Sequence, residues 1–132
     1  MKLITRDTDY AMRALMFMAK QKETMTSVSE LAKELKIPRP FLRKILQVLN
    51  KKRILKSHKG QSGGFLLATP PNRIFLVDLI EILQGPLKLN TCLLKKTTCP
   101  DVTTCVLKKR IERIEAYVIL QLKSINVTSL LN

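Results

Sequence analysis

The sequence has no apolar run long enough to cross a membrane. Its longest unbroken run, from Ala14 to Ala19, ends at Lys20 and falls far short of the roughly 20 residues that a spanning helix needs. The N-terminus becomes charged at Arg6 and Asp7, where a secretory signal would become apolar. With 132 residues, 45% of them hydrophobic, the chain is therefore expected to be a soluble cytoplasmic protein of about one domain.

Acidic residues are missing from a long central stretch. None occurs between Glu34 and Asp78, although ten lysines and arginines do, and the whole chain has a formal net charge of +14. A continuous positive surface suits a polyanion, because the counterions released from the polyanion drive association. We therefore expect a nucleic acid as partner rather than an acidic membrane, since no segment has the pattern of an isolated amphipathic anchor.

Local patterns predict two short helices joined by a tight turn. Ser27 and Glu30 form a capping-box pattern at the start of the first helix. Lys36-Ile37 supplies the turn, and the second helix is expected from Pro40 to about Lys51, because proline is tolerated in a first helical turn. On a helical wheel this second helix has a packing side, with Phe41, Leu42, Ile45, Leu46, Val48 and Leu49, and a donor-rich side, with Arg39, Arg43, Lys44, Gln47, Asn50 and Lys51. Such a pair is typical of a helix-turn-helix.

The flanking segments complete the DNA-binding unit that we expect. A buried helix over residues 8–20 precedes the pair, and two short strands, residues 54–57 and 65–68, follow it. The loop between the strands contains Gly60, Gly63 and Gly64, which supply the backbone freedom of a hairpin turn. Because the hairpin directly follows the helix-turn-helix, we interpret it as the wing of a winged helix rather than as an ordinary surface hairpin.

Two further helices are expected in the C-terminal part. One carries Leu76, Leu79, Ile80 and Leu83 and ends at Gly85-Pro86. The other runs from about Cys105 to Ile125, with an apolar stripe at Leu107, Ile111, Ile114, Val118, Leu122 and Ile125. This coiled-coil-like stripe favours packing on a partner subunit over packing on its own core. The expected fold class is mainly α with a small β-hairpin: a winged helix-turn-helix plus a long C-terminal dimerisation helix.

Cysteine and histidine are scarce, which limits the possible chemistry. Cys92, Cys99 and Cys105 are an odd number, and this argues against a disulfide framework. Thiolates so closely spaced can bind zinc or an iron–sulfur cluster, and the lack of a Cys-x-x-Cys pair disfavours structural zinc. The single histidine, His58, is expected on the second wing strand as a phosphate or solvent contact. Without a Cys–His pair or a phosphate-binding loop, catalysis is not expected.

Several motifs occur in the same order as in the members of one protein family. They are Thr8-Asp9-Tyr10-Ala11, Ile37-Pro38 before Phe41-Leu42-Arg43-Lys44-Ile45-Leu46, Lys59-Gly60-x-x-Gly63-Gly64-Phe65-x-Leu67-Ala68, Ile74-x-Leu76-x-Asp78-Leu79-Ile80, and Gly85-Pro86 ahead of the three cysteines. Over nearly the whole chain they resemble the Rrf2 family of bacterial winged-helix transcription regulators, in particular its iron–sulfur members. The resemblance implies a homodimer that binds a double-stranded DNA operator, with the recognition helix in the major groove and the wing in the minor groove.

The resemblance also places Arg39, Pro40, Arg43 and Lys44 at the reading end of the recognition helix and Lys59 in the minor groove. Together with neighbouring positions on the two helices and the wing, the residues predicted to contact DNA are Ser27, Arg39, Pro40, Arg43, Lys44, Gln47, His58, Lys59 and Gly60. Lys59 stands where members commonly have an arginine, and because lysine lacks the planar fork we expect weaker recognition of a narrow groove. Arg43 stands where one branch has a glutamate. Glutamate accepts from cytosine whereas arginine donates to guanine, so we expect a different operator.

A metal site is implied by the same resemblance, with Cys92, Cys99 and Cys105 as ligands. Some members add a histidine three residues after the third cysteine, but Lys108 occupies that position here. Other members use an aspartate near the start of the first helix, and Asp9 matches it. We therefore expect a 4Fe–4S cluster held by the three cysteines plus Asp9, or one with a labile fourth site, while a 2Fe–2S cluster stays open. The implied parts are a DNA-binding domain (1–85), a cluster-binding loop (86–105) and a dimerisation helix with tail (106–132).

The function expected from these features is a cytoplasmic transcription regulator. Its operator affinity would be switched by an iron–sulfur cluster that senses iron, redox state or nitric oxide. One alternative is a cluster-free regulator of the same fold that acts through a protein partner or through thiol oxidation. Another is a zinc-stabilised, RNA-binding winged helix.

Overall fold

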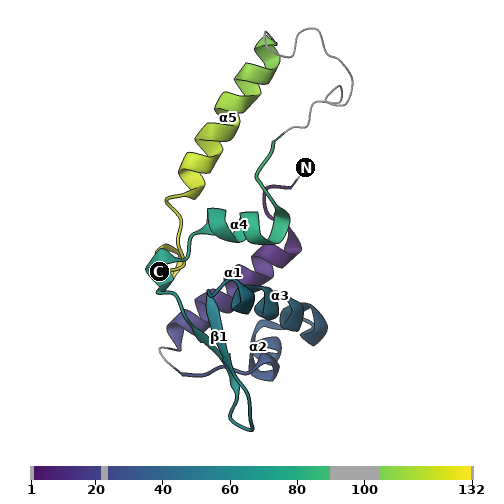
Figure 1. The fold of residues 1–132 in the computed structure, drawn as a ribbon, viewed down its shortest axis with the longest axis vertical. Coiled ribbons are helices and arrows are strands. Elements are labelled where there is room, and N and C mark those ends of the chain that lie inside the picture. Colours follow the sequence, from purple (N-terminus) through teal and green to yellow (C-terminus); the bar gives the residue numbers. More distant parts are fainter. Residues whose placement is uncertain (1, 22–23, 90–104, 132) are drawn as a thin grey trace.

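The computed structural model describes residues 2–21, 24–89 and 105–131 of the chain. Its elements follow in the order α1 (Arg6–Lys20), α2 (Val28–Leu35), α3 (Arg39–Lys51), β1 (Leu55–His58), β2 (Gly64–Leu67), η1 (Pro71–Arg73), α4 (Leu76–Gln84), α5 (Val106–Leu122) and η2 (Thr128–Leu130). The helices α1–α4 form a body from which the β1–β2 hairpin extends at one end and α5 at the other (Figure 1). This confirms the mainly helical class with a small hairpin. No helix in the described ranges combines the length and the apolar character that crossing a membrane requires.

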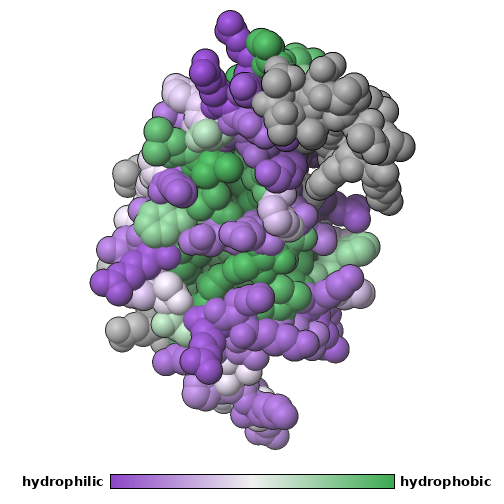
Figure 2. Space-filling model, turned by 45° about the horizontal axis from the view of Figure 1, so that its top comes forward, coloured by the Kyte–Doolittle hydropathy of each residue, from purple (hydrophilic) through white to green (hydrophobic). Residues whose placement is uncertain are grey.

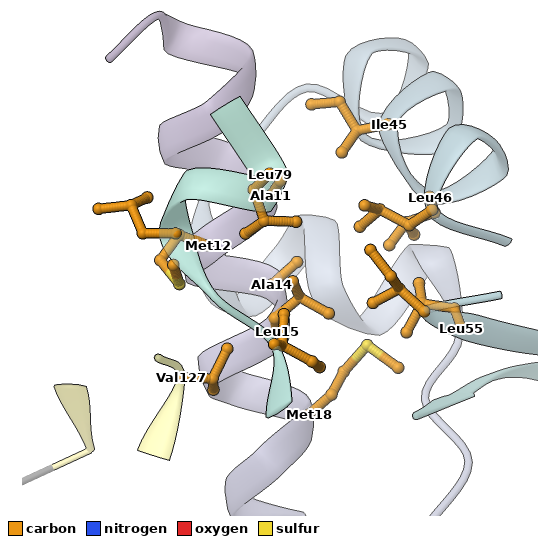
Figure 3. Packing of buried hydrophobic residues seen from close by; sticks show 14 of the residues in the cluster. Ala11, Met12, Ala14, Leu15, Met18, Ile45, Leu46, Leu55, Leu79 and Val127 are labelled. Carbon is orange, nitrogen blue, oxygen red and sulfur yellow. The ribbon is translucent and has the colours of Figure 1, made fainter. Parts of the chain in front are cut away.

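Helix α1 lies at the centre of the hydrophobic core. Its residues Ala11, Ala14 and Leu15 are completely buried, and α1 contacts both α3 and α4. Figure 3 shows Ala14 and Met18 of α1 on the side that faces Leu46 of α3 and Leu55 of β1, whereas Met12 points to the opposite side. Because alanine is small, the neighbouring helices can approach α1 closely at Ala11 and Ala14, and larger side chains such as Leu15 fill the rest of the core.

The expected helix-turn-helix forms as predicted. The Ser27 hydroxyl caps α2 by accepting a hydrogen bond from the Glu30 N–H at 3.1 Å. Lys36 ends α2 in the left-handed conformation, with φ of 56°, and the next amide, that of the buried Ile37, donates back to the Ala32 carbonyl. The chain therefore turns sharply and enters α3 one residue earlier than expected, at Arg39.

The hairpin is fastened to the start of α2. Strands β1 and β2 are antiparallel, with Leu55 opposite Leu67 and His58 opposite Gly64. Beyond this ladder, Thr26 and Phe65 exchange two backbone hydrogen bonds, of 3.0 and 2.8 Å. Gly64 allows this approach, because a Cβ atom built there would lie 2.5 Å from the Thr26 carbonyl oxygen. The wing and the helix-turn-helix are thus one hydrogen-bonded unit.

Replacing Gly64 with alanine should therefore destabilise the protein. The added methyl group forces Thr26 and Phe65 apart, and overpacking of this kind lowers the free energy of unfolding by about 1–3 kcal/mol. Denaturant-induced unfolding followed by circular dichroism measures the change, and Ser62→Ala, in the exposed tip of the same hairpin, is the control. Equal stability of the two variants would show that the contact between Thr26 and Phe65 is dispensable.

The end of the chain differs from the sequence prediction. Helix α5 stops at Leu122 rather than at Ile125. The following residues instead run beside the segment before α4: the Leu76 N–H donates to the Ile125 carbonyl at 2.9 Å, and the Val127 N–H donates to the Ile74 carbonyl at 3.0 Å. Val127 is completely buried as a result. These long-range backbone bonds and the burial of Val127 replace the hydrogen bonds and packing that another helical turn would have provided.

The apolar stripe predicted along the last helix divides into two parts. At its C-terminal end Leu122 is buried, and Val118 and Ile125 pack against the core of the same chain. At its N-terminal end Leu107 and Ile114 are 67% and 52% exposed, on the part of α5 that extends away from the body (Figure 1). Packing on the chain's own core, the less favoured interpretation, therefore holds for the C-terminal half of the stripe.

Candidate nucleic-acid interface

The outer face of α3 presents hydrogen-bond donors to solvent. Leu42, Leu46 and Leu49 are completely buried against the body. The residues predicted to contact DNA from this helix are all exposed: Arg39, Pro40, Arg43, Lys44 and Gln47. Because one side of α3 is buried and the other is exposed, its long, flexible, basic side chains are free to reach base edges and phosphates.

Phe41 does not lie where the helical wheel placed it. Its side chain is 44% exposed, and the guanidinium carbon of Arg6 lies 5.0 Å from the centre of its ring. Phe41 belongs to the first turn of α3 and precedes the buried residues of this helix, which begin at Leu42. The expectation that it packs in the core is therefore wrong: the ring stays exposed, with the Arg6 guanidinium over it.

The hairpin places a second group of predicted residues at the tip of the molecule. His58, Lys59 and Gly60 are exposed. His58 ends β1, so the expectation that it lies on the second strand is wrong. Gly60 has φ of 121°, and a Cβ on Gly63 would collide with the His58 carbonyl oxygen, so the tight loop needs glycine at both positions.

Ser27 and the wing are brought together by the bonds between Thr26 and Phe65. Ser27 stands at the N-terminus of α2, half-buried, next to this bridge. The ion pairs found within the described ranges involve Arg13, Lys88 and Lys108, so no acidic side chain there neutralises the predicted interface. We call the surface formed by Arg39, Arg43, Lys44, Lys59 and their neighbours Ser27, Pro40, Gln47, His58 and Gly60 the basic face.

Of the three cysteines, Cys105 lies within the described residues, and Cys92 and Cys99 lie outside them. Cys105 is half-exposed and caps α5, its Sγ accepting a hydrogen bond from the Lys108 N–H at 3.4 Å. The partial positive charge of a helix N-terminus suits an anionic sulfur ligand, so Cys105 fits the predicted donor set. The described residues alone contain no group of three or more metal-ligating side chains.

Glu115 attaches the segment before the cysteines to α5. Its carboxylate accepts hydrogen bonds from the Leu89 N–H at 3.0 Å and from the Lys88 ammonium at 3.4 Å, and its side chain is only 13% exposed. Glu115 and Cys105 lie roughly 15 Å apart along the helix. Both ends of the segment that carries Cys92 and Cys99 are therefore attached to α5, a restraint that no local sequence signal had indicated.

Asp9, the predicted fourth ligand, lies on a different element. Its carboxylate accepts a 2.9 Å hydrogen bond from Arg13, one turn further along α1. Cys105 is at the end of α5 that is farthest from the body (Figure 1). Within the described part of one chain these two residues are not brought together, and a ligand role for Asp9 stays a prediction.

Comparison with known proteins agrees with this architecture. The Rrf2 family model, described as an iron-dependent transcriptional regulator, matches residues 4–132. An HTH-type transcriptional regulator of Aquifex aeolicus is 34% identical over 93% of this chain and 87% of its own length. Among solved structures, the global cysteine regulator CymR of B. subtilis superposes with a TM-score of 0.82 at 24% identity, over 99% of this chain and 97% of CymR. IscR of T. potens superposes with a TM-score of 0.76 at 26% identity, over 99% and 86%. The chain therefore belongs to the Rrf2 family of transcriptional regulators.

Proposed function

We propose that this transcriptional regulator reads its operator with the outer face of α3 and anchors to it with the wing. The observation that carries the proposal is the basic face, because α3, the start of α2 and the wing are held in one unit by the bonds between Thr26 and Phe65. A helix of about 10–12 Å diameter fits the major groove of B-DNA, which is about 12 Å wide. The wing then lies beside the helix, where the adjacent minor groove runs.

Within this face the residues divide by chemistry. Arg43 is exposed on α3, and its guanidinium can donate two hydrogen bonds to guanine. Lys59 lies at the tip of the wing, and its ammonium interacts with phosphates as a point charge. Arg43 should therefore determine sequence preference, whereas Lys59 should contribute affinity on any sequence.

Alanine substitutions at these two positions should separate the two roles. Lys59→Ala should weaken binding to all sequences alike and reduce the dependence of log affinity on log salt concentration by about 1. Arg43→Ala should cost about 1–3 kcal/mol on an operator selected from a random library, and much less on random DNA. Fluorescence anisotropy with both duplexes measures the difference. If each variant loses the same affinity on both duplexes, then this division is wrong.

The state proposed for DNA binding is a homodimer formed through α5. Large apolar side chains are exposed along this helix: Val106, Leu107, Ile114, Tyr117 and Leu120. Figure 2 shows apolar surface exposed on one face of the molecule, above the hydrophilic end that carries the wing. Large apolar side chains exposed along one helix are typical of an interface. A two-fold dimer would place two basic faces on successive half-sites of one operator.

The signal proposed for this regulator is received at the cysteines, by an iron–sulfur cluster on Cys92, Cys99 and Cys105. Three features support this: the iron-dependent description of the family model, the similarity to IscR, and the half-exposed Cys105 at a helix N-terminus. Such a cluster supplies redox chemistry that protein side chains lack. The attachment of Leu89 to Glu115 holds the start of the cysteine segment beside α5.

A cluster-free thiol sensor is the second candidate function. The observation that favours it is again Cys105, which is a free, half-exposed cysteine among the described residues. The fold is shared with a protein described as the global cysteine regulator of B. subtilis. Metal and sulfide analysis of protein purified without oxygen separates the candidates, because only the first requires iron.

A further inference from the structure

The exposed ring of Phe41 supports an arginine from another helix. Arg6 is the first residue of α1 and is exposed, and its guanidinium lies over the ring at 5.0 Å from the centroid. A guanidinium stacked on an aromatic face keeps its donor edge free while its side chain loses freedom of movement. Arg6 forms no ion pair within the described ranges, so this edge is available to a ligand.

The helical turn that carries Arg6 is held firmly by Gln84, the last residue of α4. The Gln84 Oε1 accepts hydrogen bonds from the Thr5 N–H at 3.0 Å and from the completely buried Thr8 hydroxyl at 2.6 Å. Its Nε2 donates to the Leu3 carbonyl at 3.2 Å. These bonds hold the backbone before Arg6 and the Thr8 side chain after it, so the turn that carries Arg6 is fixed and its guanidinium lies over the ring.

Arg6 is also placed against local electrostatic preference. A cation at the first position of a helix faces the positive end of the helix dipole, where an acidic residue would be favoured. Asp7 lies about 100° around the helix axis from Arg6, and Asp9 is engaged by Arg13 at 2.9 Å. A cation that has no ion-pair partner in the described part of the chain and sits in an unfavourable position is typical of a residue that serves a ligand.

We infer that Arg6, stacked on Phe41, binds a backbone phosphate of DNA beside the basic face. The inference rests on the proposed insertion of α3 into the major groove. A helix nearly fills that groove, so groups that flank its first turn meet the phosphates at the groove edge. Arg6 lies over the first turn of α3, on the side of α1, and its planar donors suit a phosphate group. The interface thus includes a third element, α1, in addition to α3 and the wing.

Salt-dependent binding to random DNA tests this inference, because a phosphate contact is independent of sequence. The probe is a fluorescent duplex of about 30 base pairs, three helical turns. Arg6→Ala should lower the slope of log affinity against log salt by about 1 and weaken binding about tenfold at low salt. Arg6→Lys and Phe41→Leu keep the charge, so both should keep the slope, with affinities between those of the wild type and Arg6→Ala.

The matched control is Arg13→Ala, which removes an exposed arginine of the same helix that is paired with Asp9. It should leave the slope unchanged, and circular dichroism melting shows that each variant is folded. If Arg6→Ala matches Arg13→Ala while Lys59→Ala lowers the slope, then the inference is wrong and the proposed interface stands. If neither Arg6→Ala nor Lys59→Ala changes the slope, then the basic face itself is not the DNA interface.

Discussion

Replacing Ile114 with glutamate should leave the protein folded but dissociate the proposed α5 dimer into monomers. Ile114 is 52% exposed in the single chain and lies on the same stripe as Leu107, which is 67% exposed, so neither side chain is needed for the core. At a two-fold interface the new carboxylate would be buried without a partner, once in each subunit. A buried unpaired charge costs several kcal/mol, so the dissociation constant should rise by about a hundredfold or more. Sedimentation velocity measures the change.

Two controls show whether the effect belongs to the interface. Leu130→Glu places the same charge on another partly exposed apolar residue, 38% exposed in η2, and should leave the dimer intact. Leu122→Glu changes a residue of α5 that is only 6% exposed and should unfold the chain rather than split the dimer. If Ile114→Glu stays dimeric, then the interface lies elsewhere and the stripe serves only the core of its own subunit.

The helix-turn-helix and the wing could be predicted because their signals are local. The Ser27 cap is decided by residues within one turn. The separation of α3 into a buried and a donor-rich side follows from helical periodicity, and Gly60, Gly63 and Gly64 mark a tight hairpin. Glycine is required at position 64 for a reason outside the hairpin, because the atom nearest to a Cβ there is the Thr26 carbonyl oxygen.

Features that depend on distant residues could not be predicted in this way. The wheel assigned Phe41 to the core because it treats all apolar side chains alike, whereas its environment is decided by Arg6, 35 positions earlier. The end of α5 was placed too late because Val127 is buried by pairing with Ile74, which precedes α4. The Gln84 bonds to Thr5 and Thr8 likewise join residues more than 70 positions apart. The ligand roles of Cys92, Cys99 and Asp9 stay predictions.

Replacing Cys92, Cys99 or Cys105 singly with alanine should abolish the visible absorbance of anaerobically reconstituted protein, because each thiolate supplies a strong iron–sulfur bond. Asp9→Ala should retain this absorbance but lose it faster in air, because a carboxylate is a harder and more labile ligand than a thiolate. Arg13→Ala is the control for Asp9, since it removes the partner of the carboxylate without removing the carboxylate. Metal analysis accompanies the spectra, because zinc in place of iron would indicate a structural site.

The same variants connect the cysteines to DNA binding. If the cysteines are the sensor, then operator affinity should differ between reconstituted and metal-free wild type, and this difference should vanish in all three cysteine variants.

Glu115→Gln tests the restraint on the segment, because it keeps the size of the side chain but weakens the bonds to Lys88 and Leu89. We expect this variant to bind a normal amount of iron but to show a smaller difference in operator affinity between its reconstituted and metal-free forms. A cysteine variant with full absorbance, or wild-type affinity that is indifferent to iron, would reject the iron–sulfur switch. In the second case, a change in affinity after thiol oxidation would favour the cluster-free regulator.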